Sequence, residues 1–93
     1  MEQEEIFERI TQERDYQDHM CSLNNLPTNL SIDAELLMLK HYIDKAISIR
    51  TKEPHDRPAL SEIRKITAIG VRCLETHGCP KRDLVKGFLS GDV

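Results

Sequence analysis

The residues of this 93-residue chain best suited to chemistry are three cations in its last third. Arg64, Lys65 and Arg72 are expected on one outer face of a helix, away from Ile66 and Leu74, because helical neighbours recur every three or four residues. Arginine offers phosphate a planar fork, and lysine offers a movable point charge. The pattern favours binding of an anion, and the alternative is an ordinary solvated helix face.

A nucleotide ligand would also need a surface for its base, and the chain has few aromatic residues to provide one. Tyr16 and Tyr42 are the best candidates, and we favour Tyr16, because a phenol can both stack and hydrogen-bond. The alternative for either ring is structural packing. Arg14 or Arg82 from a neighbouring copy would add charge to the phosphate site, whereas Lys45 is expected on the outer side of its helix.

Other kinds of site find little support in the sequence. The four histidines and three cysteines lack metal-ligand spacing, and there is no glycine-rich phosphate loop, so we expect neither a metal nor a cofactor. His77, just before Gly78, is expected to bond the last carbonyls of its own helix. The net charge of −3 and a polar connection at residues 51–57 make a nucleic-acid partner unlikely.

These side chains must be positioned by helices, because apolar residues recur at spacings of three and four and no strand pattern is present. We predict a single all-α domain over residues 1–93: an antiparallel helical hairpin with a leading N-terminal helix and a weak C-terminal tail. The expected helices cover about residues 3–18, 32–50 and 58–77, with a possible short helix at 83–89. A loop is expected over residues 20–30.

Capping residues mark the ends of the two hairpin helices. Ser31 is a suitable N-cap, and Pro58 suits a first turn. Gly78 can terminate the last helix. Gly70 costs about 1 kcal/mol relative to alanine inside a helix, so it is expected to mark a close helix–helix approach. The apolar stripe of that helix is expected to consist of Leu60, Ile63, Ile66, Gly70, Cys73, Leu74 and His77.

Composition indicates self-assembly in a reducing compartment. With 39% hydrophobic and 4% aromatic residues, the chain has little material for a core, and the helix at 32–50 is apolar over more than one face. We therefore expect a homo-oligomer. Three cysteines suit free thiols in a cytoplasm, and no apolar run approaches the roughly 18 residues of a membrane span.

Two segments carry a resemblance to a known family. Ile6–Gln17 and Ile63–Gly78, together with Arg82, look like small phage-encoded proteins that resemble the all-α nucleotide pyrophosphohydrolases of the MazG-like kind. The resemblance covers most of the chain by pattern. It implies a helical hairpin, a nucleotide ligand and the cytoplasm of a phage-infected host cell.

The chain departs from that family at its metal-binding motif. The family uses Glu-Glu-x-x-Glu on one helix and Glu-x-x-Asp on the next, because several carboxylates must converge on Mg²⁺. Here Glu35 is accompanied by Leu36 and Met38, and the position three after Glu62 is Lys65. The resemblance therefore implies a degenerate metal site, and a cation at that position would repel Mg²⁺.

Three functions follow as hypotheses. The first is a non-enzymatic protein that binds and sequesters a nucleotide or cyclic nucleotide signal of bacterial immunity at a protomer interface, by analogy with small helical phage proteins. The second is a divergent MazG-like pyrophosphohydrolase that uses Glu35, Asp44 and Glu62 around Mg²⁺. The third is an interaction module that inhibits a host factor through its apolar faces.

Overall fold

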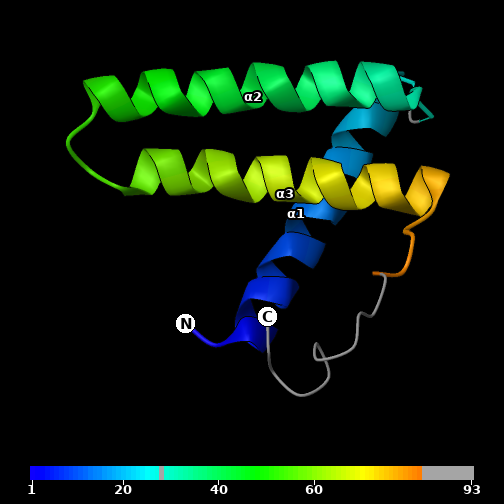
Figure 1. Ribbon diagram of the computed structural model, residues 1–93, viewed down its shortest axis with the longest axis horizontal. Coiled ribbons are helices and arrows are strands. Elements are labelled where there is room, and N and C mark those ends of the chain that lie inside the picture. Colours follow the sequence, from blue (N-terminus) through cyan, green and yellow to red (C-terminus); the bar gives the residue numbers. More distant parts are fainter. Residues whose placement is uncertain (28, 83–93) are drawn as a thin grey trace.

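Three α-helices of equal length make up the described part of the chain, which comprises residues 1–27 and 29–82 of a computed structural model (Figure 1). Helix α1 spans Gln3–Leu23, α2 spans Ile32–Lys52 and α3 spans Arg57–His77. No strand occurs among these residues. The all-α class and the three predicted helices are therefore confirmed, while the possible short helix at 83–89 lies outside the described residues.

The ends of the helices follow the local chemistry of the sequence. The Ser31 hydroxyl accepts a hydrogen bond from the Ala34 amide at 3.2 Å, as an N-cap does. Pro58 lies in the first turn of α3, and Gly78 ends that helix with φ of 102°, where a side chain would be strained. Both predicted caps of α3 are present.

Two expectations about helix ends were wrong. Helix α1 continues to Leu23 instead of stopping at residue 18, because no helix breaker precedes Asn24 and Asn25, and Asn25 adopts a left-handed φ of 56°. His77 does not bond the carbonyls of its own helix. Its Nε2 lies 2.7 Å from the carbonyl oxygen of Leu30, so it ties the end of α3 to the segment that leads into α2.

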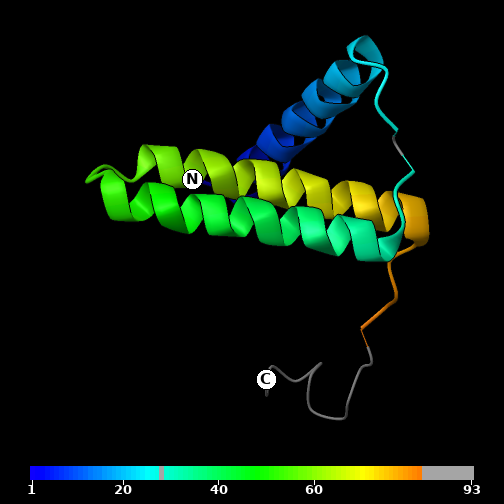
Figure 2. The ribbon, with the colours of Figure 1, turned by 90° about the horizontal axis from the view of Figure 1, so that it is seen from above.

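Helices α2 and α3 form an antiparallel hairpin, and α1 crosses α3 on one side of it (Figures 1 and 2). The connection between α2 and α3 is short, which forces the two helices to lie side by side. No Cα atom of α1 lies within 8 Å of one in α2, so α1 is held by α3 alone at that range. One side of the hairpin is therefore covered by α1, and among the described residues no helix covers the other side.

The interior of this arrangement is small and unusually polar. Among the described residues, the buried apolar side chains are Ala68 and Ile69, whereas Glu35, Glu62 and Arg72 are buried as well. Charged residues are rarely buried unless they are paired. Ion pairs therefore make up a large part of the contacts inside the hairpin, and the hydrophobic content of the sequence does not predict this.

The predicted inward stripe of α3 was partly wrong. Leu60, Ile63 and Leu74 are exposed, and an added Cβ at Gly70 would meet nothing within 4 Å. The stripe was placed by spacing alone, but α3 packs against two helices on the side that carries Ala68 and Arg72. Its apolar residues on the remaining side, Leu60, Ile63 and Leu74, are therefore about half exposed.

Within the described residues, no helix is long and apolar enough to cross a membrane.

Candidate functional site

A cavity of about 330 Å³ lies where the three helices meet. Each helix contributes both polar and apolar groups to its wall, and we call it the three-helix cavity. Its lining residues are Glu13, Tyr16, Gln17, Met20 and Cys21 of α1, Leu26 of the connection between α1 and α2, Met38, Tyr42 and Lys45 of α2, and Lys65, Ile69 and Arg72 of α3. It is the hollow in which the largest number of the predicted ligand residues meet.

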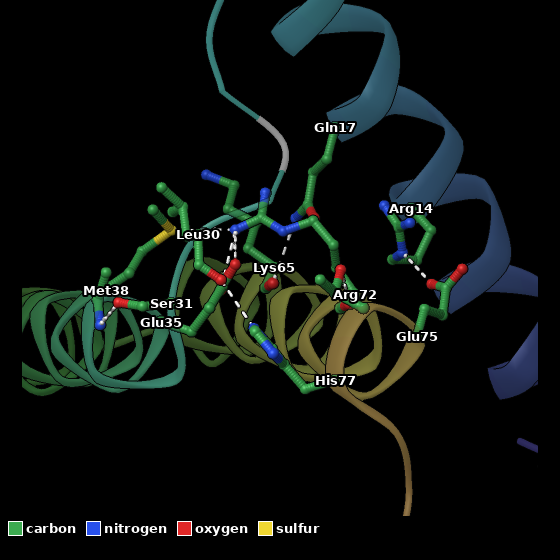
Figure 3. A network of polar contacts seen from close by, with 12 residues as sticks. Arg14, Gln17, Leu30, Ser31, Glu35, Met38, Lys65, Arg72, Glu75 and His77 are labelled. Atoms are coloured by element: carbon green, nitrogen blue, oxygen red, sulfur yellow. Dashed lines mark hydrogen bonds and ion pairs between the residues drawn. The ribbon is translucent and has the colours of Figure 1, made fainter.

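Arg72 forms the floor of the cavity through a buried ion pair with Glu35 (Figure 3). Its Nη2 donates to both carboxylate oxygens at 3.0 Å and lies 3.4 Å from the sulfur of Met38. Its Nε is buried and finds no hydrogen-bond partner among the described residues. A buried guanidinium with an unused N–H can donate to a further anionic or carbonyl oxygen.

The outer position expected for Arg72 was therefore wrong. Its side chain is only 8% exposed, and that of Glu35 is 1% exposed. Because α1 packs on the side of α3 that was expected to face water, the residues there become interior, and the Glu35 carboxylate supplies the counter-charge that the buried Arg72 needs. A helical periodicity cannot reveal this, since it does not specify which neighbours cover which face.

Two lysines share a single carboxylate at one wall of the cavity. Glu62 Oε1 lies 3.1 Å from Lys65 Nζ and 3.7 Å from Lys45 Nζ, and the Glu62 side chain is 6% exposed. The lysine side chains are 37% and 48% exposed, so their ammonium groups can turn toward a ligand. Two positive charges facing one negative charge leave a formal excess of one cation here.

The α1 wall of the cavity supplies an amide and an aromatic ring. Gln17 Nε2 donates to the backbone carbonyl of Lys65 at 3.2 Å and to Glu13 Oε2 at 3.3 Å, while its buried Oε1 has no hydrogen-bond partner among the described residues. Tyr16 lies at the same wall and is half exposed. An unused acceptor beside an accessible ring suits a ligand with both donors and a flat face.

A second tyrosine stands on the opposite side, on α2. Lys45 Nζ lies 5.8 Å from the centre of the Tyr42 ring, within the range of a cation–π contact. His41 meets the same ring edge-on, with the ring centres 5.2 Å apart. Tyr42 and Lys45 therefore lie against each other at the wall of the cavity.

Three of the predicted site residues gather at the cavity, and three do not. Tyr16, Lys65 and Arg72 line it together. Arg14 lines a different hollow between α1 and α3, and Arg64 pairs with Glu13 at 2.9 Å on the outside of the molecule. Arg82 is exposed beyond the end of α3, as the last described residue.

Arg14 has a structural role within this chain. Its Nε lies 2.7 Å from Glu75 of α3 and its Nη1 lies 2.8 Å from Asp18, so it joins α1 to α3 (Figure 3). The hydrogen bond to Glu75, followed by that to Asp18, raises the pKa of Arg14 above its ordinary value even though partial burial opposes this. The guanidinium therefore stays charged at any working pH.

Sequence reasoning missed Gln17 and did not assign Lys45 to the site. Lys45 is exposed, as expected for an outer face, and it also lines the cavity because α1 bounds the space beside α2. A signal was available, since Lys45 is seven residues after Met38 and three after Tyr42, and all three line the cavity. The direction of that shared face could not be known without the crossing of α1.

The carboxylates assigned to a metal in the enzymatic alternative do not converge. Glu35 is paired with Arg72, Glu62 is paired with two lysines, and Asp44 is exposed beside Lys40 at 2.9 Å. Among the described residues, no three His, Cys, Asp or Glu side chains are grouped so that they could hold a metal ion.

Comparisons with protein-family models, curated proteins and solved structures found no match to this chain. The resemblance to MazG-like proteins therefore stays a prediction, and the site is defined by its own geometry.

Proposed function

We propose that this protein binds a phosphate-bearing nucleotide in the three-helix cavity and holds it without hydrolysis. The observation that carries the proposal is the meeting of three cations from two helices at one cavity. Lys45 and Lys65 share one carboxylate, and Arg72 Nε has no hydrogen-bond partner in the described part of the chain. A phosphate has the charge to engage both lysines and the oxygens to accept from the guanidinium.

The other walls of the cavity are suited to the remainder of a nucleotide. Tyr16 and Tyr42 come from different helices and offer rings on which a base can stack. Gln17 offers an amide oxygen to a base or ribose donor. The volume of about 330 Å³ is at the lower end of small-molecule sites, which span roughly 300–1,000 Å³, and it favours one nucleotide unit over an extended ligand.

Binding without turnover is favoured over pyrophosphate hydrolysis because the carboxylates that would bind the metal are already in ion pairs. Hydrolysis through Mg²⁺ needs several carboxylates free to converge on the metal. Glu35 and Glu62 are instead engaged by Arg72, Lys45 and Lys65. The biological role that we propose is sequestration of a nucleotide or cyclic nucleotide signal of bacterial immunity, by analogy of size and charge with phage proteins of that kind. The cavity lies within one chain, and a site shared between protomers stays a prediction.

Equilibrium dialysis against adenosine, AMP, ADP, ATP, cyclic AMP and 3′,5′-cyclic dinucleotides tests the proposal. We expect at least one phosphorylated compound to bind and adenosine to bind much more weakly, because the phosphate provides the charge interaction. Affinity should fall as salt rises. Recovery of every compound unbound would overturn the proposal, and release of pyrophosphate with Mg²⁺ or Mn²⁺ would favour the enzymatic alternative.

Substitution of single lysines locates the bound phosphate. Lys45→Gln and Lys65→Gln should each weaken binding by about tenfold or more, since each removes a charge-assisted contact. Lys40→Gln is the matched control, because Lys40 is on α2, pairs with exposed Asp44 and lies outside the cavity. Equal losses in all three variants would indicate a general charge effect and not a site.

A further inference from the structure

An exposed apolar face lies on the hairpin, on the side away from α1. It consists of side chains that are between 45% and 59% exposed and that come from both helices of the hairpin: Leu36, Ile43 and Ile47 of α2, and Leu60, Ile63 and Leu74 of α3. We call this set the apolar face. Single exposed hydrophobic residues are common, but a continuous set across two helices marks an interaction surface.

A groove between the two helices lies at the end of this face that is next to the α2–α3 connection. Its walls include Ala46 and Ile47 from α2, and Ala59, Leu60 and Ile63 from α3, and its described lining includes no residue of α1. Helix α1 packs on the other side of the hairpin (Figure 2). The groove is therefore separate from the three-helix cavity.

The middle of α3 on this face is built for a close backbone approach. Gly70 lies seven residues after Ile63 and four before Leu74, and nothing lies within 4 Å of the position that its Cβ would take. Thr67, between them, donates its hydroxyl to the Ile63 carbonyl at 2.8 Å, so its polar group is satisfied within the helix. A glycine inside a helix is unfavourable for that helix alone, and the chain as described supplies no neighbour that uses the space.

The spacing of the apolar face matches helix–helix packing. Leu36, Ile43 and Ile47 are separated by seven and four residues, and Leu60, Ile63, Thr67, Gly70 and Leu74 follow steps of three and four. Such spacing keeps side chains on one seam of a pair of helices. Both helices of the hairpin carry a seam of this kind, so the face can pair with a copy of itself about a two-fold axis.

We propose that the apolar face binds the same face of a second copy, and that the two hairpins form a four-helix bundle with both α1 helices on the outside. A second copy is favoured over an unrelated partner because the face is complementary to itself. It has large exposed apolar side chains and, at Gly70, open space into which such a side chain of the other copy can pack. Arg50 and Asp56 are the charged residues of the described groove lining, and they pair with each other, so the groove itself presents no excess charge to an identical surface. In this arrangement both three-helix cavities remain open to solvent, and nucleotide binding does not depend on assembly.

Sedimentation velocity on the full chain tests the assembly. We expect a dimer at about 100 µM, and a dissociation constant weakened by about 100-fold or more in Ile47→Glu, because the charge would be desolvated in the seam. The matched control is Leu37→Glu, which introduces the same charge at a 69% exposed leucine outside the apolar face and should leave the dimer unchanged.

A second variant separates assembly from folding. Gly70→Ala has open space in the single chain and favours the helix, so the variant should fold, yet it should weaken dimerisation by about tenfold, because an added methyl overpacks a close approach. Circular dichroism checks the helix content of each variant. A monomeric wild-type chain would overturn the proposal, and so would a dimer that Ile47→Glu and Gly70→Ala both leave intact.

Discussion

The two sides of the hairpin contrast in where they place charge and where they place apolar surface. On the side that α1 covers, Glu35, Glu62 and Arg72 are buried. On the opposite side, residues such as Ile47 and Ile63 are more than half exposed. This is the reverse of the usual distribution, in which apolar groups are interior and charges lie in water. The polar side carries the nucleotide site that we propose, and the apolar side carries the proposed dimer interface.

The contrast also shows what each side contributes to stability. A buried ion pair gains little net free energy over apolar packing, because both charges lose their hydration, but it strongly disfavours arrangements in which one charge lacks its partner. The apolar side has a favourable interaction still available, since area removed from water contributes about 25 cal/mol per Å². The buried ion pair on one side of the hairpin therefore fixes how the helices are arranged, and burial of apolar area on the other side would add stability.

The largest expected effect comes from breaking the buried pair on the cavity side. Glu35→Gln leaves Arg72 buried without a counter-charge, and the free energy of unfolding should fall by about 3–5 kcal/mol, as measured by urea denaturation. The double variant Glu35→Leu with Arg72→Met removes both charges and should lose less than the single variant. A single variant that loses under about 1 kcal/mol would show that the pair does not order this side.

A smaller effect is expected at the N-terminal end of α2, which belongs to neither side of the hairpin. Ser31→Ala removes the hydrogen bond from the Ala34 amide, so α2 should lose about 1 kcal/mol of stability. Because Ser31 belongs to neither the cavity nor the apolar face, nucleotide affinity and dimerisation should change little in the folded protein. Thermal denaturation monitored at 222 nm measures the loss, and Ser22→Ala, in the last turn of α1, is the control.

The smallest effect is expected for an ion pair at the edge of the apolar side. Arg50 and Asp56 have side chains that are 55% and 74% exposed, so water screens their attraction. Arg50→Gln should change the free energy of unfolding by no more than about 0.5 kcal/mol. The difference between this loss and the loss in Glu35→Gln, both from urea titrations, measures how much burial changes the contribution of an arginine–carboxylate pair to the free energy of unfolding. Equal losses at the two pairs would contradict the contrast between the sides.

Much of the secondary structure could be predicted from local signals. Ser31, Pro58 and Gly78 mark helix ends through their own backbone and side-chain chemistry, and all three lie where the structure uses them. The position of Leu23 inside α1 was missed, because a helix end without a strong breaker is set by a balance of small propensities.

The candidate site was predicted only in part. Lys65 and Tyr16 were identified from residue type, and both line the cavity. Arg72 was identified but placed in solvent, and Lys45, which is exposed as expected, was not recognised as a residue of the cavity. Helical periodicity defines which residues share a face, but it does not define which face a neighbouring helix covers.

The sequence by itself determined the helices, their caps, the thin supply of core residues and the surplus of apolar surface, because each depends on composition or on residues close together in the chain. Only the tertiary structure decided that α1 crosses α3 on one side of the hairpin, so that no helix of the described residues covers the other side. The packing of α2 against α3 pairs Arg72 with Glu35 and brings Lys45 to Glu62, whose carboxylate Lys65 also contacts. Helix α1 then bounds the cavity that these three cations line, and Gly70 stays open. The reason is physical: packing between helices depends on contacts distant in sequence, and no local pattern contains them.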